Sequence, residues 1–359
     1  MKIAIFGHKT IPSRLGGVEI VAEELSCRMA AMGHRVTCYN RGGKPGQHRG
    51  VVLKAVPTIP GKGLAAVSSS FFAAVAAAFS DAEVVHIHAE GPAFFCWFPR
   101  LFGKRVVVTV HGLDWQRRKW EKSLGKQYIL AGERMAVRFA DRIIVLSRNL
   151  QRYFREAYGR ETVFIPNGVS KPQILPPEEI CKLGLEKDGY ILFLGRLVPE
   201  KEIHTLISAF RSVNTVKKLV IAGSSSDTDG YVSRLKAMAQ GDERMIFTGF
   251  VEGKRLKELY SNAYLYVLPS KVEGMPLSLL EAMSYGNCCL VSDIPELREV
   301  VEDKGVIFPC GNAEALRAVL ERLLREPDRV AAYKAEAAEF VCAKYSWEDA
   351  VERTLKVYR

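Results

Sequence analysis

Short apolar runs that recur along the whole chain constrain its fold most. VVHIHA (84–89), RVVVTVHG (105–112) and CCLVSD (288–293) are examples, and they are apolar almost throughout instead of alternating with polar residues. A strand that is buried on both faces has this composition, as in a parallel sheet covered by helices. Segments with helical periodicity separate the runs, so the sequence predicts an α/β protein with parallel sheets. The predicted strands are 2–7, 35–40, 51–56, 84–89, 105–112, 142–147, 162–168, 190–196, 218–223, 244–250, 263–270, 288–293 and 305–309.

The alternation of strands and helices restarts in the middle of the chain. Residues 170–180 (SKPQILPPEEI) contain three prolines and neither periodicity, which is typical of a linker. A chain of 359 residues is long enough for two α/β domains of roughly 150–200 residues each. We therefore expect domains at 1–170 and 171–345, followed by a terminal helix at 346–359.

Cysteine usage and hydropathy favour a cytoplasmic protein. None of the eight cysteines forms a CxxC pair or has zinc spacing, and most lie in apolar runs, which indicates buried reduced thiols. The N-terminal MKIAIFG is too short an apolar run for a signal peptide and is expected to be a strand. Residues 62–79 are rich in alanine but contain three serines, so we expect a buried or interfacial helix and not a membrane-spanning one.

The basic residues are concentrated in the first half of the chain. Residues 1–170 contain 25 Lys and Arg against 12 Asp and Glu, whereas residues 171–359 contain 26 against 28. Such asymmetry indicates that the first half faces an anionic partner.

The segment 271–286 (KVEGMPLSLLEAMSYG) is the strongest candidate for a binding site. Glu273 and Glu281 stand eight positions apart on either side of Pro276, which suits the first turn of a helix that Gly286 ends. The backbone N–H groups of residues 274–277, apart from Pro276, which has none, would then form a helix N-terminus, which binds phosphate or sugar oxygens. The alternative is an ordinary amphipathic helix with solvated glutamates.

Three further segments follow predicted strands, where open α/β sheets bind ligands. Arg196 and Lys201 bracket a turn in FLGRLVPEKEI (193–203), and the two cations suit a diphosphate, although a solvated turn would look the same. Gly16 and Gly17 precede a helix and permit close approach of an anion. The loop is not GxGxxG, and the second strand ends without an acidic residue, so NAD binding is poorly supported.

The fourth segment is VHGLDWQRRKW (110–120), in which His111 and Asp114 follow a buried strand. A lone histidine is often structural, and only its position at a strand end points to a site.

Taken together, these motifs resemble the retaining glycosyltransferases of family 4, which have the GT-B fold. The resemblance covers essentially the whole chain and rests on GGVE (16–19), VHGLD, IPNGV (165–169), GRLVPEK, FTGFV (247–251) and EGMPLSLLEAMSYG. It implies two Rossmann-like domains whose parallel sheets face each other across a cleft. The first would receive the acceptor and the second would bind the nucleotide sugar, with the last helix crossing back onto the first domain.

The resemblance also implies roles for individual residues. Arg196 and Lys201 would bind the donor diphosphate, and Glu281 would hold the ribose hydroxyls. Glu273 would hold the transferred sugar, and His111 would lie near the reacting carbon. The remaining expected contacts are those of the main chain at Gly274, Met275, Pro276 and Leu277 with the sugar or phosphate, of Gly16 and Gly17 with the phosphate, and of Phe250 and Val251 with the base.

Metal-independent transfer with retention is the expected mechanism. No Asp-x-Asp follows a predicted strand, and Asp227-Thr228-Asp229 is interpreted as a surface loop. In the family, the leaving phosphate helps to deprotonate the acceptor, and Asp114 is the carboxylate to watch as a base. One departure is Glu202, where the family often has glycine, because a carboxylate beside a diphosphate is unfavourable unless it points away.

The expected co-substrate is a nucleoside-diphosphate sugar, with a UDP-sugar favoured, and the expected acceptor is a glycan or a lipid-linked molecule. Residues 117–142 contain eight basic and three acidic residues, and 97–105 mixes aromatic and basic side chains. These features favour peripheral association with the anionic inner face of a membrane, while a solvated basic face is the alternative. No nucleic-acid-binding motif accompanies the charge. A non-hydrolysing sugar-nucleotide epimerase and a non-catalytic partner subunit remain the competing functions.

Overall fold

The computed structural model describes residues 1–61, 63–120 and 124–359, which form two units. The N-terminal unit comprises Met1–Gly168 together with Trp347–Arg359, and the C-terminal unit comprises Val169–Ser346. Lys62 and residues 121–123, which the sequence analysis included in its apolar and basic segments, lie outside the described residues.

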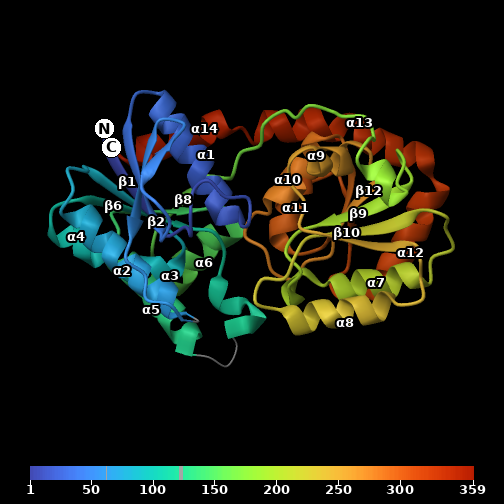
Figure 1. Ribbon diagram of the computed structural model, residues 1–359, viewed down its shortest axis with the longest axis horizontal. Coiled ribbons are helices and arrows are strands. Elements are labelled where there is room, and N and C mark those ends of the chain that lie inside the picture. Colours follow the sequence, from blue (N-terminus) through green and yellow to red (C-terminus); the bar gives the residue numbers. More distant parts are fainter. Residues whose placement is uncertain (62, 121–123) are drawn as a thin grey trace. The chain divides into compact units, whose positions relative to one another are not determined.

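The N-terminal unit contains one eight-stranded sheet in the order β3-β4-β2-β1-β5-β6-β7-β8. All of its neighbouring strands are parallel except β3 and β4. In Figure 1, α1 and α14 lie on one face of the sheet, and α2 and α5 lie on the other. The strands are β1 (Lys2–Phe6), β2 (Arg35–Arg41), β3 (Gly46–His48), β4 (Val51–Val56), β5 (Val84–His88), β6 (Arg105–Val110), β7 (Arg142–Val145) and β8 (Val163–Phe164). The α-helices are α1 (Gly17–Ala31), α2 (Leu64–Ala78), α3 (Glu90–Ala93), α4 (Trp97–Leu101), α5 (Leu124–Phe139), α6 (Arg148–Tyr158) and α14 (Trp347–Val357).

The C-terminal unit contains a six-stranded parallel sheet in the order β11-β10-β9-β12-β13-β14. Helices α7, α8 and α12 cover one face, and α9, α10 and α13 cover the other (Figure 1). The strands are β9 (Tyr190–Leu194), β10 (Lys218–Ala222), β11 (Met245–Gly249), β12 (Leu265–Leu268), β13 (Cys288–Ser292) and β14 (Val306–Phe308). The α-helices are α7 (Ile203–Arg211), α8 (Asp229–Ala239), α9 (Gly253–Ser261), α10 (Leu277–Ser284), α11 (Pro295–Val301), α12 (Ala313–Arg325) and α13 (Pro327–Lys344).

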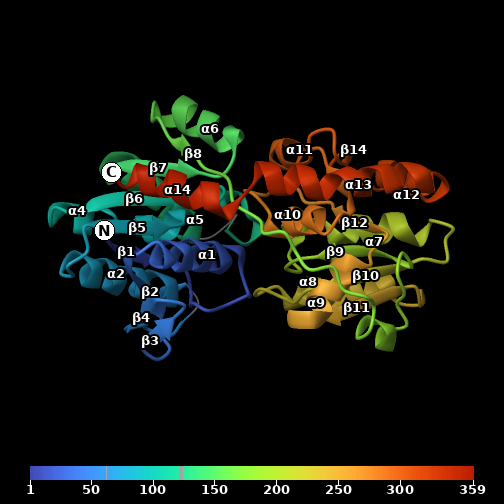
Figure 2. The same cartoon turned by 90° about the horizontal axis from the view of Figure 1, so that it is seen from above.

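Every predicted strand is present, and the α/β prediction is confirmed. The additional strand β3 consists of Gly46–His48, which has no apolar residue, and it pairs antiparallel at the sheet edge seen in Figure 2. The apolar runs are buried as expected: all five residues of β5 and all four of β12 are buried. In each sheet the order of the parallel strands reverses direction once, between β1 and β5 and between β9 and β12.

The cysteines are all free, and five of them are buried. Cys181 is exposed, and Cys310 and Cys342 are half-buried, so the expectation of buried thiols is wrong for Cys181. Burial raises the pKa of Cys38 to about 12, which keeps that thiol protonated. In the described ranges, no helix combines the length and apolar character needed to cross a membrane.

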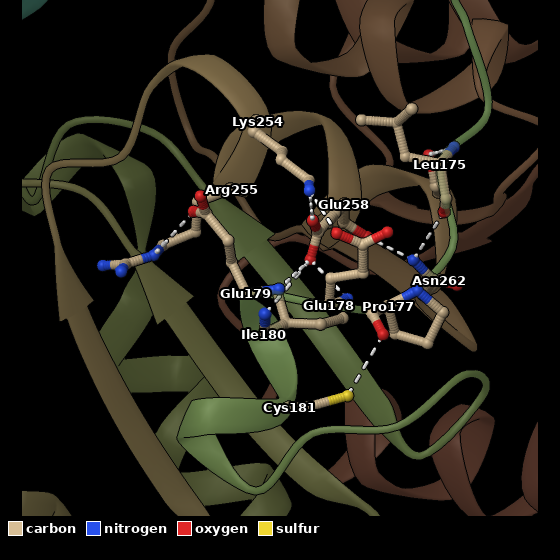
Figure 3. Close-up of polar contacts among 11 residues, drawn as sticks. Leu175, Pro177, Glu178, Glu179, Ile180, Cys181, Lys254, Arg255, Glu258 and Asn262 are labelled. Carbon is tan, nitrogen blue, oxygen red and sulfur yellow. Dashed lines mark hydrogen bonds and ion pairs between the residues drawn. The ribbon is translucent and has the colours of Figure 1, made fainter.

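One buried glutamate, Glu258, binds the backbone of the proline-rich segment 170–180, which precedes β9 (Figure 3). Oε2 of Glu258, on α9, accepts hydrogen bonds from the backbone N–H groups of Glu178, Glu179 and Ile180 at 2.9, 2.7 and 3.1 Å. Burial acts to raise the pKa of Glu258, but these three donors and Lys254 outweigh it, so the pKa lies below its ordinary value. The carboxylate therefore caps the short 3₁₀ helix Ile180–Leu183 from outside its own chain segment.

Candidate functional site

The C-terminal unit brings two loops together where its strand order reverses. The loop 195–202 follows β9, and residues 269–276 follow β12, the strand next to β9 in the sheet. The backbone N–H of Lys271 donates to the carbonyl oxygen of Glu200 at 2.8 Å, which joins the two loops. Ligands of open α/β sheets bind at such a reversal point.

Gly223 shapes this edge of the sheet from the neighbouring strand β10. Its φ is +148°, and a Cβ atom placed on it would lie 1.8 Å from the carbonyl oxygen of Gly195. Only glycine can occupy this position, since such an approach is impossible for any residue with a side chain. The close contact fixes the first turn of the loop that carries Arg196 and Lys201.

Lys201 and Glu273 form an ion pair across the two loops. Each side chain is only 10% exposed, so the pair is partly shielded from water. Arg196 lies half-buried on the same loop as Lys201. The structure therefore brings together a cation and a carboxylate that are 72 positions apart in the sequence.

Helix α10 carries Glu281 and begins beside this ion pair. Leu277 is the first helical residue and Pro276 is the N-cap, so the prediction that Pro276 lies in the first turn is wrong by one position. Gly286 has φ +74° just after the helix, as predicted. Oε2 of Glu281 accepts a hydrogen bond of 3.1 Å from the hydroxyl of Tyr260, whose ring stacks on Tyr285. This contact holds the Glu281 carboxylate in one orientation.

Phe250 and Val251 follow β11, two strands away from β9. Phe250 is 42% exposed and Val251 is buried. Gly274 and Met275 lie between Glu273 and the N-cap of α10, with Met275 buried. Within the C-terminal unit, the residues predicted to contact the sugar and the diphosphate therefore lie at the reversal point of the sheet, and those predicted to contact the base follow the outer strand β11.

Glu202 has the left-handed conformation, with φ 52° and ψ 32°. Glycine adopts this conformation most easily, which accounts for the glycine expected at this position. The Glu202 carboxylate accepts a hydrogen bond of 2.7 Å from the hydroxyl of Thr205 and lies 3.3 Å from Nε2 of His204. Two residues of the first turn of α7 thus contact the Glu202 carboxylate.

In the N-terminal unit, Gly16 is the N-cap of α1 and Gly17 is its first residue. The buried Glu19 turns back over this helix N-terminus, since a Cβ on Gly16 would lie 2.2 Å from its Oε2. Oε1 of Glu19 accepts from the backbone N–H of Lys9 at 3.0 Å. Gly16 therefore makes room for a carboxylate of the chain itself, a contact that was not predicted from the sequence.

His111 and Asp114 follow β6, next to β5 in the sheet. Nε2 of His111 lies 2.9 Å from Nδ1 of His88, and burial lowers the pKa of His111 to about 4. Asp114 pairs with Arg117 at 2.8 Å. His111 is therefore neutral at physiological pH, so its ring can form hydrogen bonds but carries no charge.

Sequence reasoning also missed His8, Asn40, His88 and Glu90. Oδ1 of Asn40 lies 2.9 Å from Nε2 of His8 and accepts from the backbone N–H of Ile11 at 3.1 Å, so it holds the loop after β1. All four residues lie at or just after strand ends, which is the one signal that could have found them. Among the described residues, no group of three or more His, Cys, Asp or Glu side chains could hold a metal ion. Asp227 and Asp229 are exposed, as interpreted, but Asp229 begins helix α8, so the loop interpretation is wrong for that residue.

Two family models match the chain in succession. The model described as Glycosyltransferase Family 4 matches residues 15–171, and that described as Glycosyl transferases group 1 matches residues 177–340. An uncharacterised glycosyltransferase of Methanocaldococcus jannaschii is 33% identical over 49% of this chain and 46% of its own length, so the match spans about half of that relative. The phosphatidyl-myo-inositol mannosyltransferase of Mycobacterium leprae is 27% identical over 77% of this chain and 73% of its own.

Solved structures resemble the fold over its full length. Sucrose-phosphate synthase of Thermosynechococcus elongatus superposes with a TM-score of 0.84 at 22% identity, covering 100% of this chain and 98% of its own. The Anabaena protein HepE in complex with UDP-glucose gives a TM-score of 0.83 at 17% identity, covering 99% and 98%.

Proposed function

The chain belongs to glycosyltransferase family 4 and has the GT-B fold, and on this premise we propose the reaction that it catalyses. A hexose-type sugar is transferred, with retention and without a metal, from a nucleoside-diphosphate sugar to a glycan or lipid-linked acceptor. A UDP-sugar is the favoured donor. UDP-glucose in the complex of the similarly folded HepE supports this choice.

The observation that carries the proposal is the shielded Lys201–Glu273 ion pair at the reversal point of the C-terminal sheet. A sugar leaves a nucleoside diphosphate with negative charge developing on the phosphate oxygens. Lys201, Arg196 and the N-terminus of α10 supply positive charge and N–H donors for those oxygens. Glu273, already held by Lys201, is then placed to accept hydrogen bonds from sugar hydroxyls, and Glu281 from the ribose hydroxyls.

Residues 171–345 bind the donor in this proposal, residues 1–170 receive the acceptor, and residues 346–359 complete the N-terminal domain. Main-chain groups of Phe250 and Val251 meet the base. In the N-terminal domain, His111 contacts the sugar near the reacting carbon and Asp114 lies beside the acceptor hydroxyl.

The proposed place of work is the cytoplasm, at the anionic inner face of a membrane. On α5 and just after it, Arg134, Arg138 and Arg142 are exposed, and α6 adds exposed arginines of its own. Phe79, Leu101 and Phe102 are 68%, 72% and 46% exposed, and the rings of Phe79 and Phe102 lie 4.6 Å apart. Basic side chains near an anionic leaflet contribute about 1 kcal/mol each, and apolar side chains enter the headgroup region. The M. leprae mannosyltransferase is named for a lipid acceptor, which supports a lipid-linked acceptor here.

A thermal-shift screen of UDP-, GDP-, ADP- and dTDP-sugars tests the donor. A cognate donor at 100 times its Kd stabilises the protein by about 2.7 kcal/mol. Lys201→Ala and Arg196→Ala should each lower transfer about 100-fold or more, by analogy with the loss of an oxyanion donor. Wild-type transfer by both variants would contradict the phosphate assignment. Interconversion of the free sugar nucleotide without transfer would favour an epimerase, and binding without turnover a non-catalytic subunit.

Co-sedimentation with liposomes tests the membrane proposal separately. We expect binding to vesicles that contain anionic phospholipid at low ionic strength and release at high salt. No binding to anionic vesicles at low ionic strength would make a soluble acceptor the better proposal.

A further inference from the structure

Two side chains, one at the end of β5 and one just after it, contact the loop that carries His111 and Asp114. β5 ends at His88 and α3 begins at Glu90, and Ala89 between them has a left-handed backbone with φ 74°. Nδ1 of His88 lies 2.9 Å from Nε2 of His111. Oε2 of Glu90 accepts a hydrogen bond of 2.8 Å from the backbone N–H of Asp114. His88 thus contacts the ring of His111, and Glu90 holds the backbone of the same loop at Asp114.

Glu90 lies close to a second buried carboxyl group, that of Glu133 on α5. Both side chains are fully buried, and Oε1 of Glu90 and Oε2 of Glu133 have no hydrogen-bond partner among the described residues. Two buried carboxylates repel each other, which favours a proton on one of them. Burial, together with Glu133, raises the pKa of Glu90 well above its ordinary value. Oε1 of Glu133 accepts from the hydroxyls of Tyr153, at 2.8 Å, and Tyr158. Glu90 is therefore the neutral partner.

The packing of α5 on α3 depends on a close approach between Gly132 and the backbone of Glu90. A Cβ atom placed on Gly132 would lie 2.0 Å from the carbonyl oxygen of Glu90. Glycine at position 132 therefore allows the backbone of α5 to approach the start of α3, where the neighbouring Glu133 meets Glu90. The packing of α5 on α3 therefore brings the two carboxyl groups together.

The tautomer of His111 follows from the surroundings of His88. His88 is fully buried, its pKa is held well below the ordinary value by burial, and its Nε2 has no hydrogen-bond partner in the described ranges. A proton on that Nε2 would be a buried N–H without an acceptor, which costs more than an unused lone pair. The proton therefore lies on Nδ1 of His88, which donates to Nε2 of His111. Neutral His111 must then carry its own proton on Nδ1.

We propose that His88 and Glu90 are positioning residues for glycosyl transfer, with His88 holding His111 in the Nδ1-protonated form and neutral Glu90 holding the backbone at Asp114. The role in transfer rests on the proposed function, in which His111 contacts the sugar and Asp114 lies on the acceptor side. The tautomer of His111 and the neutral state of Glu90 do not rest on it, so they can be tested without a substrate.

Nitrogen NMR of histidine-labelled protein tests the role of His88 directly. The His111 resonances are identified by their loss in His111→Gln. We expect a protonated Nδ1 and a bare Nε2 on His111 in the wild type. The same pattern should hold in His88→Asn, whose amide can donate from nearly the same place, and should be lost in His88→Phe. A protonated Nε2 on His111 in the wild-type protein would overturn this assignment.

Thermal unfolding across pH tests the neutral state of Glu90. The titratable groups facing it are Glu133 on α5 and Asp114, itself paired with Arg117, with Tyr153 and Tyr158 on α6 beyond Glu133. Because the pKa of Glu90 is raised in the folded state, its contribution to stability is full below the unfolded pKa of about 4.3 and is lost as the pH rises through the folded value. Glu90→Gln, which cannot ionise, should therefore gain stability relative to wild type between pH 5 and pH 8. If Glu90→Gln instead became less stable relative to wild type as the pH rises from 5 to 8, a neutral Glu90 would be refuted.

Transfer from the donor identified in the thermal-shift screen, with water or the acceptor as recipient, tests positioning. Glu90→Gln retains an oxygen for the Asp114 N–H and a donor for Glu133, so its rate should stay within about twofold of wild type. Glu90→Leu should lower the transfer rate about 100-fold, because reacting groups that are misplaced by about 1 Å lose this much rate. The Kd of the donor should stay unchanged. Equal losses in both variants would contradict a neutral anchor. If no sugar nucleotide binds even the wild type, the proposed function fails while the NMR and pH results still decide the state of His111 and Glu90.

Discussion

Replacing Glu258 by alanine should destabilise the C-terminal unit through the segment 175–181 alone. The change removes one carboxylate that accepts three backbone N–H groups, at Glu178, Glu179 and Ile180 (Figure 3). Ile180 is buried, whereas Glu178 is exposed and Glu179 half-buried, so water can replace the carboxylate at two of the three donors only. The loss is therefore dominated by one buried N–H without a partner.

The size of the effect follows from these three donors. An unsatisfied buried N–H costs about 1–3 kcal/mol, and each hydrogen bond exchanged for water costs about 0.5–1.5 kcal/mol. We expect a loss of about 3 kcal/mol, which corresponds to a fall in Tm of roughly 6–12 °C for a unit of this size. The pKa of Glu258 is lowered in the folded state, so its contribution exists above the unfolded pKa of about 4.3 and is lost as pH falls through the folded value.

Thermal unfolding of wild type and Glu258→Ala at pH 7 and pH 3.5 tests both the size of the loss and its pH dependence. The difference in Tm between the two proteins should be larger at pH 7 than at pH 3.5. Glu178→Ala is the matched control, because its ion pair with Lys254 joins side chains that are 59% and 47% exposed and should contribute less than about 1 kcal/mol. A loss in Glu258→Ala no larger than in this control would refute the cap.

Three further outcomes concern the donor site. Gly223→Ala should weaken UDP binding measured by calorimetry, because its Cβ would strike the carbonyl oxygen of Gly195. Gly230→Ala on α8 is the control and should not weaken binding, because a Cβ there meets open space. Equal UDP affinities in the two variants would contradict the role given to the contact between Gly223 and Gly195. Glu273→Gln should impair sugar transfer and leave UDP affinity largely intact, whereas Glu281→Gln should weaken both, and identical UDP affinities would contradict the separate roles. Transfer should continue in EDTA, and its abolition with recovery on Mg²⁺ or Mn²⁺ would show that a metal is needed at the diphosphate.

The strands and the loops after them could be predicted from the sequence because both depend on local pattern. Apolar runs such as 84–89 and 288–293 are strands, and the candidate residues Lys201 and Glu273 meet because parallel strands end at one edge of a sheet. The short strand Gly46–His48 has no such pattern and is held by pairing with β4. Its existence depends on the sheet and not on its own residues.

The buried polar contacts of the N-terminal unit could not be predicted, because they depend on tertiary packing. Glu133 counts as one more charge in the basic segment 117–142, yet it is fully buried close to Glu90, and α4, β6 and the loop after β6 separate the two residues in the sequence. Glu19 lies in the GGVE motif, but nothing in the motif says that its carboxylate folds back over the helix N-terminus. In each case the partner is chosen by the fold.

The return of α14 to the N-terminal unit has a consequence for the order of events during synthesis. Tyr358 donates or accepts a hydrogen bond of 2.6 Å with buried His86, and Arg28 on α1 pairs with Glu348 at 2.9 Å. A ribosome finishes residues 1–168 first and needs roughly 10–35 s more to make the C-terminal unit before α14 emerges, at about 5–20 residues per second. Until then the face of α1 that α14 covers stays open to solvent and to chaperones. The N-terminal unit, although its synthesis begins first, can therefore be completed only after the whole C-terminal unit has been made.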